Sequence, residues 1–180
     1  RSQCRELRAD CLNYIRTRWG IVSSEEAADW AMPYLDLVHH APWGLYECQQ
    51  PGNPAQGIPI PLFSLVYHDS LIVPWNADPN TKGGYSLPPD RVQFLAALAN
   101  AGIPYISMTA SAKEIAAMEP LRELHRSCGT LPMTGHRFLS ADYLEEETAF
   151  ADGSVVTVNH RDNQWSILRN GQLIAASFPQ

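Results

Sequence analysis

The chain has 180 residues, a formal net charge of −6 at pH 7 and 45% hydrophobic residues. This length and apolar content allow a sizeable core, built as one domain or as one and a half. Lysine and arginine do not cluster, which argues against nucleic acid as a partner. The apolar runs fall far short of a membrane span, so membrane insertion is not expected.

The first segment has the pattern of an amphipathic helix. Apolar residues between Cys4 and Trp19 recur at steps of three and four. Cys4 and Cys11 share one face of this helix, and we expect both to be buried. The chain has no C-x-x-C pair, so it offers no structural zinc motif. A short strand over 21–23 then leads into Glu25.

The segment Pro61–Asp69 is the strongest local signal in the sequence. Its nearly continuous apolar run predicts a strand buried on both faces, as in parallel sheets and barrels. His68 and Asp69 would then stand at the carboxyl end of this strand, where barrel enzymes keep their chemistry. The aromatic Trp75 just beyond it suits the floor of a sugar-binding site.

Further helices and strands alternate up to about residue 128. We expect a helix after Pro88-Pro89-Asp90, a short strand over 104–108, and a helix that begins with a capping box of Ser111 and Glu114. Pro120 either kinks this last helix or begins a second one. Strand–helix alternation of this kind predicts parallel strands joined by right-handed crossovers.

The pattern changes near Phe138 to alternating strands with short turns. Asp152-Gly153 and Asn170-Gly171 are strong signals for two-residue hairpin turns. The four strand candidates are 143–150, 154–159, 165–169 and 172–178. A meander of about 40 residues is too small for an independent sandwich. It should therefore pack on the preceding helices or begin a larger β domain.

Two carboxylates are candidates for catalysis. Glu25 follows one predicted strand and Asp69 another, so in a parallel barrel both would lie on the same rim. Glycoside cleavage needs an acid for the leaving oxygen and a carboxylate that attacks or stabilises the sugar cation. Glu25 is also explained as an acid in the first turn of a helix. Asp69 would directly follow a buried strand, so its charge needs either a partner or a role in binding or catalysis.

Histidines and aromatic residues supply the other candidate contacts. The six histidines match no zinc signature, and we expect neither a metal nor another cofactor. If the chain were a metal-dependent hydrolase, His68 and Asp69 would be its ligands, together with His39 or His40. Trp30, Trp43, Tyr67, Trp75 and Tyr85 fall in or beside the presumed rim loops, where their rings stack on sugars or merely pin the loops to the barrel.

Several stretches together resemble a known group of glycoside hydrolases. These stretches are 23–33, 61–69, 124–125, 132–139, 150–153 and 158–159. Through them the chain is similar to the bacterial families related to endo-α-N-acetylgalactosaminidase and α-N-acetylgalactosaminidase. The resemblance implies an α/β fold with the C-terminal part of a (β/α)8 TIM barrel over 1–137. An antiparallel β region over 138–180 would then start a C-terminal β-sandwich.

The resemblance also implies roles for individual residues. Glu25 matches the acid/base, and Asp69 matches the carboxylate that stabilises the transition state or holds the substrate. The nucleophilic aspartate would precede Arg1, so the missing N-terminal part of the barrel is a candidate partner. We expect substrate contacts from His68, Tyr67, Trp30, Asp29, Trp75 and His136.

The leading hypothesis is a fragment of a retaining α-glycosidase that acts on galactosamine- or galactose-containing glycans. Such a function favours an extracellular or periplasmic location. Two alternatives stay open at this point. One is a non-catalytic carbohydrate-binding remnant that keeps the aromatic rim. The other is the metal-dependent hydrolase that would use His68 and Asp69.

Overall fold

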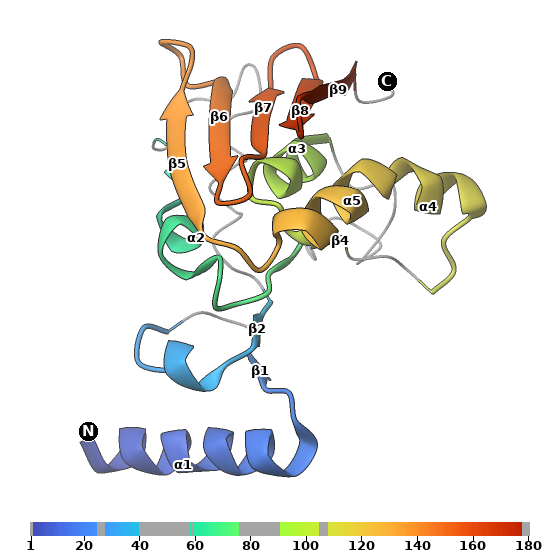
Figure 1. The fold of residues 1–180 in the computed structure, drawn as a ribbon. Helices are drawn as coiled ribbons and strands as arrows, with labels where there is room; N and C mark the ends of the chain where they lie inside the picture. Colours follow the sequence, from blue (N-terminus) through green and yellow to red (C-terminus); the bar gives the residue numbers. More distant parts are fainter. Residues whose placement is uncertain are drawn as a thin grey trace.

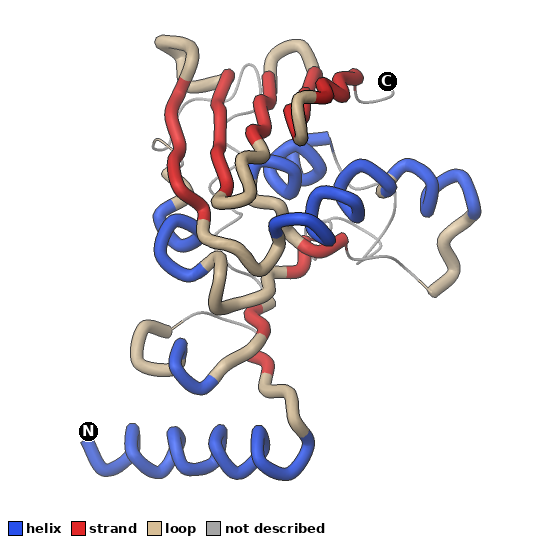
Figure 2. The backbone as a smooth tube through the Cα atoms, in the orientation of Figure 1, coloured by secondary structure: helices blue, strands red, loops and turns tan. Residues whose placement is uncertain are grey.

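The computed structural model describes residues 2–24, 28–39, 58, 60–75, 91–104 and 108–177. Helix α1 (Ser2–Trp19) lies at one end of the molecule and a five-stranded sheet at the other (Figure 1). Short strands and helices fill the space between them (Figure 2). Among the residues described, no helix has the length and apolarity needed to cross a membrane.

The middle of the molecule consists of short parallel strands that alternate with helices. The strands are β1 (Ser23–Ser24), β2 (Leu37–Val38), β3 (Pro74–Trp75) and β4 (Ile103–Pro104). The intervening helices are η1 (Met32–Tyr34), α2 (Leu62–Tyr67) and α3 (Arg91–Ala99). Strand β1 pairs in parallel with β2, and β3 pairs in parallel with β4. The predicted parallel pairing of strands in a strand–helix alternation is therefore confirmed.

The segment predicted as a buried strand is instead helix α2. Its backbone bonds run from Leu65 to Pro61 and from His68 to Ser64, as in a helix. The side chains of Leu62 and Val66, four residues apart, are exposed on its outer face. A mostly apolar run of six residues is too short for periodicity to separate a strand from a helix, which explains the error. The strand follows five residues later, at Ile72–Trp75.

Helix α1 forms where the sequence predicts it, but most of the apolar residues predicted to form its buried face are exposed. Cys4 and Cys11 are exposed, so the expectation that both are buried is wrong. Tyr14 and Trp19 are also exposed. Periodicity identified a helix that has an apolar face, but it carries no information about what covers that face.

The other helices follow the sequence closely. Helix α4 (Ala112–Ala117) begins after Ser111, and α5 (Glu119–Cys128) begins immediately before Pro120. Proline is well tolerated in the first turn of a helix because the amide hydrogen it lacks has no partner there. Pro120 therefore begins a second helix rather than kinking the first.

The C-terminal part is an antiparallel meander in which each strand pairs with the next. Its strands are β5 (Met133–Phe138), β6 (Glu145–Phe150), β7 (Val155–Asn159), β8 (Gln164–Arg169) and β9 (Gln172–Ser177). The four predicted strands are confirmed. Positive φ angles at Asn170 (51°) and Gly171 (74°) fit the predicted hairpin turn. Strand β5, which the sequence did not reveal, spans the expected boundary between residues 137 and 138.

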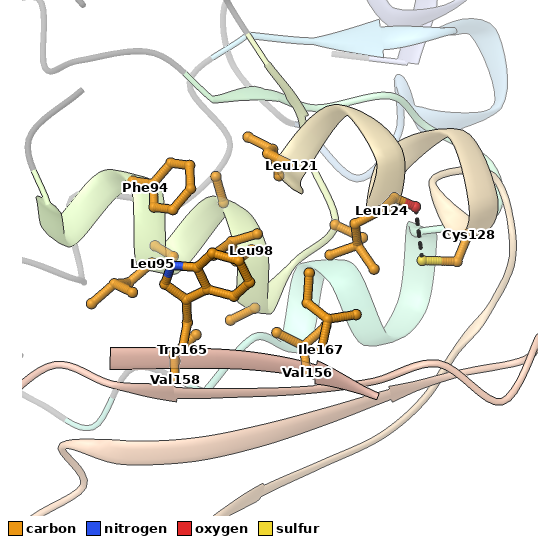
Figure 3. Packing of buried hydrophobic residues seen from close by; sticks show 14 of the residues in the cluster. Phe94, Leu95, Leu98, Leu121, Leu124, Cys128, Val156, Val158, Trp165 and Ile167 are labelled. Carbon is orange, nitrogen blue, oxygen red and sulfur yellow. Dashed lines mark hydrogen bonds between the residues drawn. The ribbon is translucent and has the colours of Figure 1, made fainter. Parts of the chain in front are cut away.

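One hydrophobic core joins the sheet to the helices before it (Figure 3). The apolar side chains on the inner face of the sheet include Val156, Val158, Trp165 and Ile167. They pack against Leu95 and Leu98 of α3 and against Leu121 and Leu124 of α5. Burying each of these leucines contributes about 1.5–3 kcal/mol. The meander thus packs on the preceding helices, as its small size predicted.

Candidate active-site edge

Backbone hydrogen bonds join the two pairs of short parallel strands into one parallel array, which we call the parallel ladder. Asp36 N donates to Val22 O (2.9 Å), and Val38 N donates to Ile72 O (3.0 Å). Ile103 N donates to Val73 O (3.1 Å) and so extends the ladder to β4. Because all the strands run in the same direction, their carboxyl ends share one edge. Open and closed parallel sheets both place their ligand sites at this edge.

The residues that follow the strand ends are therefore the candidates for chemistry. His39 follows β2 directly, is half-buried, and donates its backbone N–H to Ser24 O at 2.8 Å. Glu25 follows β1 directly in the sequence, but lies outside the described residues. Trp75 ends β3 and pairs its backbone with Pro104. The sequence thus places Glu25 at the end of a strand in this parallel array.

Asp69 lies near the amino end of a parallel segment, not at a carboxyl end. It follows helix α2 and precedes Ile72, where the chain enters the parallel ladder. Its carboxylate is exposed and accepts a hydrogen bond from Ser70 Oγ at 2.9 Å. The premise that Asp69 follows a buried strand is wrong, because that segment is a helix. Glu25 follows the carboxyl end of a strand, whereas Asp69 precedes the amino end of one.

His68 occupies a structural position between three segments. Its Nδ1 lies 2.6 Å from Leu131 O, and its Nε2 lies 2.8 Å from Asn100 O. The ring is buried and lies 5.1 Å from the ring of Phe150. Both ring nitrogens therefore have backbone partners, and the side chain joins α2 to the ends of α3 and α5.

The remaining predicted substrate contacts are dispersed. Tyr67 packs its ring against Phe63 at 5.2 Å, beside the smaller core cluster. Trp30 is half-buried against the same cluster, whereas Asp29 is exposed. None of these three residues directly follows a strand end. Of the set, only Trp75 stands at the carboxyl edge of the ladder.

His136 belongs to a buried polar cluster in the antiparallel sheet that sequence reasoning missed. Its Nε2 lies 2.7 Å from Oε2 of Glu146, and His160 Nε2 lies 2.9 Å from Oε1 of the same carboxylate. Burial opposes ionisation of Glu146, but the hydrogen bonds and charge attraction of the two histidines outweigh it and lower its pKa. The signal was Glu146 itself, which shares the inward register of β6 with Thr148 and Phe150.

The described residues do not favour the metal-dependent alternative. None of them forms a group of three or more histidine, cysteine or acidic side chains suited to a metal ion. His68 already has two backbone partners, and Asp69 is paired with Ser70. His40 lies outside the described residues.

Comparison with solved structures relates the chain to the α-N-acetylgalactosaminidase NagBb from Bifidobacterium bifidum. The ligand-free structure shares 34% sequence identity and has a TM-score of 0.69, covering 97% of this chain and 26% of that one. The GalNAc complex gives 32% identity, a TM-score of 0.69, and coverage of 96% and 27%. The Gal-NHAc-DNJ complex gives 31% identity, a TM-score of 0.68, and the same coverage. No protein-family model and no curated protein matches the sequence.

The match extends over nearly all of this chain, and so includes both the parallel ladder and the antiparallel sheet. It confirms the family resemblance that the sequence motifs predicted. The chain spans about a quarter of the length of the solved enzyme it matches. By sequence and structure, the chain is similar to about a quarter of the bacterial α-N-acetylgalactosaminidase NagBb, and this match supports a glycoside hydrolase of that family.

Proposed function

We propose that this chain is part of the catalytic region of a retaining α-glycosidase that removes N-acetylgalactosamine from glycans. Residues 1–137 would supply the last strands of a (β/α)8 barrel, and residues 138–180 would begin a β-sandwich. The observation that carries the proposal is the match to NagBb over 97% of this chain. The parallel ladder with intervening helices supports the barrel assignment, because barrels are built from such units.

Glu25 is the proposed acid/base. Its place directly after β1 supports this role, since the carboxyl ends of β1, β2 and β3 share one edge. As an acid it would protonate the leaving oxygen, and as a base it would then activate the water that releases the sugar. The attacking carboxylate would come from the N-terminal part of the same barrel. Trp75, at the end of β3, would contribute an apolar surface for the sugar ring.

The position of Asp69 in the chain does not favour the role predicted for it, that of the carboxylate that stabilises the transition state or holds the substrate. A retaining pair of carboxyl groups lies about 5–5.5 Å apart across the scissile bond. In the sequence Glu25 follows the carboxyl end of β1, whereas Asp69 precedes the amino end of a parallel segment, so a shared substrate contact is not expected. The proposed mechanism therefore uses Glu25 without Asp69.

The decisive experiment is a kinetic comparison in the complete polypeptide that contains this sequence. We expect it to hydrolyse aryl α-N-acetylgalactosaminides and to release the α-anomer first, which NMR of the product detects. Glu25→Gln should lower kcat by orders of magnitude on substrates with poor leaving groups and by less on activated aryl substrates. Added azide should partly rescue this variant on the activated substrates.

Glu26→Gln is the matched control, because it changes the neighbouring carboxylate in the same way. Unchanged turnover in Glu25→Gln would contradict the assignment. Binding of N-acetylgalactosamine without any turnover by the unaltered polypeptide would instead favour the carbohydrate-binding alternative.

A further inference from the structure

A groove of about 600 Å³ lies between helix α1 and the segment that carries η1. Its polar and aromatic lining residues are Arg5, Glu6, Asp10, Asn13, Trp30 and Tyr34. None of them comes from a strand or from the residue that directly follows one. A volume of this order falls in the range of small-molecule sites, about 300–1,000 Å³.

Hydrogen bonds hold α1, one wall of the groove, against the segment that carries η1, the other wall. Arg16 donates from Nη2 to Asp36 Oδ1 at 2.9 Å and from Nη1 to Pro33 O at 3.2 Å. Asp36 Oδ2 also accepts the backbone N–H of Val22 at 2.9 Å. Leu12 packs on the smaller core cluster, which tethers the middle of α1 as well. The lining side chains of α1 are thus presented from a tethered helix.

The aromatic wall has a different character from the helical one. Trp30 and Tyr34 are half-buried; Trp30 lies two residues before the 3-10 helix η1 and Tyr34 is its last residue, so the backbone of this short segment positions both rings. Across from them, Glu6, Asp10 and Asn13 follow one another at steps of four and three, on one face of α1. Among the described residues, Arg5, Glu6 and Asp10 form no ion pair. Their hydrogen-bonding groups remain open to a ligand.

This combination selects a particular class of ligand. Two carboxylates against one guanidinium disfavour phosphates and other anions. A purely apolar ligand would leave the polar wall without partners. A neutral polyol that has an apolar C–H face satisfies both walls, because its hydroxyls meet acids and amides while its C–H face meets aromatic rings.

We infer that the groove between α1 and η1 is a saccharide-binding site, in which Trp30 and Tyr34 contact the sugar face and Asp10 and Asn13 bind its hydroxyls. The site is additional to the edge where Glu25 is proposed to act. Only the choice of N-acetylgalactosamine as the probe rests on the proposed function. A site of this kind would hold a second part of a glycan, or a neighbouring chain of the same substrate.

The test is an NMR titration of the complete polypeptide that contains this sequence with N-acetylgalactosamine, and with glucose for comparison. The resonance to follow is the indole N–H of Trp30, assigned with Trp30→Phe. We expect it to shift with saturation as the sugar is added. Asp10→Ala and Asn13→Ala should each weaken binding by about tenfold, since each removes a polar partner of the ligand. Both change exposed residues of α1, so the fold should persist.

Trp19→Ala is the control, because this exposed tryptophan lies on α1 but does not line the groove. The inference is overturned if neither sugar shifts the Trp30 indole, or if Asp10→Ala and Asn13→Ala bind like the unaltered chain. It is also overturned if Glu25→Gln abolishes the response while the α1 variants keep it. That last result would place the sugar at the strand edge and would support the proposed function alone.

Discussion

The carboxylate of Glu146 lies 2.9 Å from Nε2 of His160, and both side chains are completely buried. His136 approaches the second oxygen of the same carboxylate at 2.7 Å. An ionised acid in the interior persists only when such partners compensate for the lost hydration. Substitutions within this cluster should therefore be costly to stability.

Glu146→Gln should destabilise the fold by about 2–4 kcal/mol. The amide has one acceptor oxygen in place of two, so its NH₂ group would face a histidine N–H. Urea unfolding followed by tryptophan fluorescence measures the change. Glu147→Gln is the control, because Glu147 forms a surface pair with Arg137 and should cost less than about 1 kcal/mol. Equal losses in the two variants would contradict a special role for the buried cluster.

The same cluster predicts how stability depends on pH. The folded-state pKa of Glu146 is lowered from its ordinary value of 4.5. Its stabilising contribution is therefore complete above that value and is lost as the pH falls through the lower, folded-state pKa. The difference in unfolding free energy between the unaltered chain and Glu146→Gln should shrink in this acid range. A difference that stays constant from pH 7 to pH 3 would refute the assignment.

Asp69 and His68 should respond to substitution in different ways. In the complete polypeptide, Asp69→Asn should leave glycosidase turnover within about twofold, because its exposed carboxylate contacts only Ser70 among the described residues. His68→Ala should destabilise the fold by about 2–4 kcal/mol, because it removes the contacts of the buried ring with Leu131 O and Asn100 O and opens a cavity beside Phe150. Thermal unfolding and kinetics, measured on both variants, separate the two effects. A large loss of kcat in a stably folded Asp69→Asn protein would restore the earlier catalytic assignment.

The sequence revealed most where local chemistry determines structure. The hairpin dipeptide Asn170-Gly171, the break at Pro120 and the alternation of β7 and β8 each specify their element without help from the rest of the chain. Strand β5 escaped notice because Thr134, Gly135 and Arg137 interrupt any apolar alternation. Its pairing with β6 depends on partners eight to seventeen residues away in the sequence.

The candidate site shows the same division. The sequence predicted a strand that ends just before Glu25, and strand β1 ends there. Asp69 could not be placed in this way, because its interpretation depended on whether 62–67 is a strand or a helix. The strand of this unit is formed by residues 72–75, which pair with distant parallel partners, and a local pattern does not reveal that pairing. Glu146 was recognisable as an inward acid only once the register of β6 was known.

Gly129 should not tolerate a side chain. A Cβ atom there would meet Nδ1 and Cε1 of His125 and lie 2.6 Å from the His125 carbonyl oxygen. His125 is itself held by a contact of 2.8 Å between its Nδ1 and Ala101 O, so it cannot move away freely. Gly129→Ala should therefore cost about 1–3 kcal/mol of stability. Gly135→Ala is the control, since its Cβ would meet no atom within 4 Å. A Gly129→Ala protein as stable as this control would contradict the packing described here.

The cysteines should differ sharply in reactivity. Burial raises the pKa of the Cys128 thiol to about 12, and the nearby Asp152 carboxylate adds to the effect. Because the thiolate is the reactive species, Cys128 should resist alkylation in the folded protein at neutral pH. Cys4 and Cys11 are exposed on α1 and should react readily. Mass spectrometry after brief iodoacetamide treatment, with and without urea, measures each site. Rapid modification of Cys128 in the folded chain would show that the core around Leu124 opens far more easily than its packing implies.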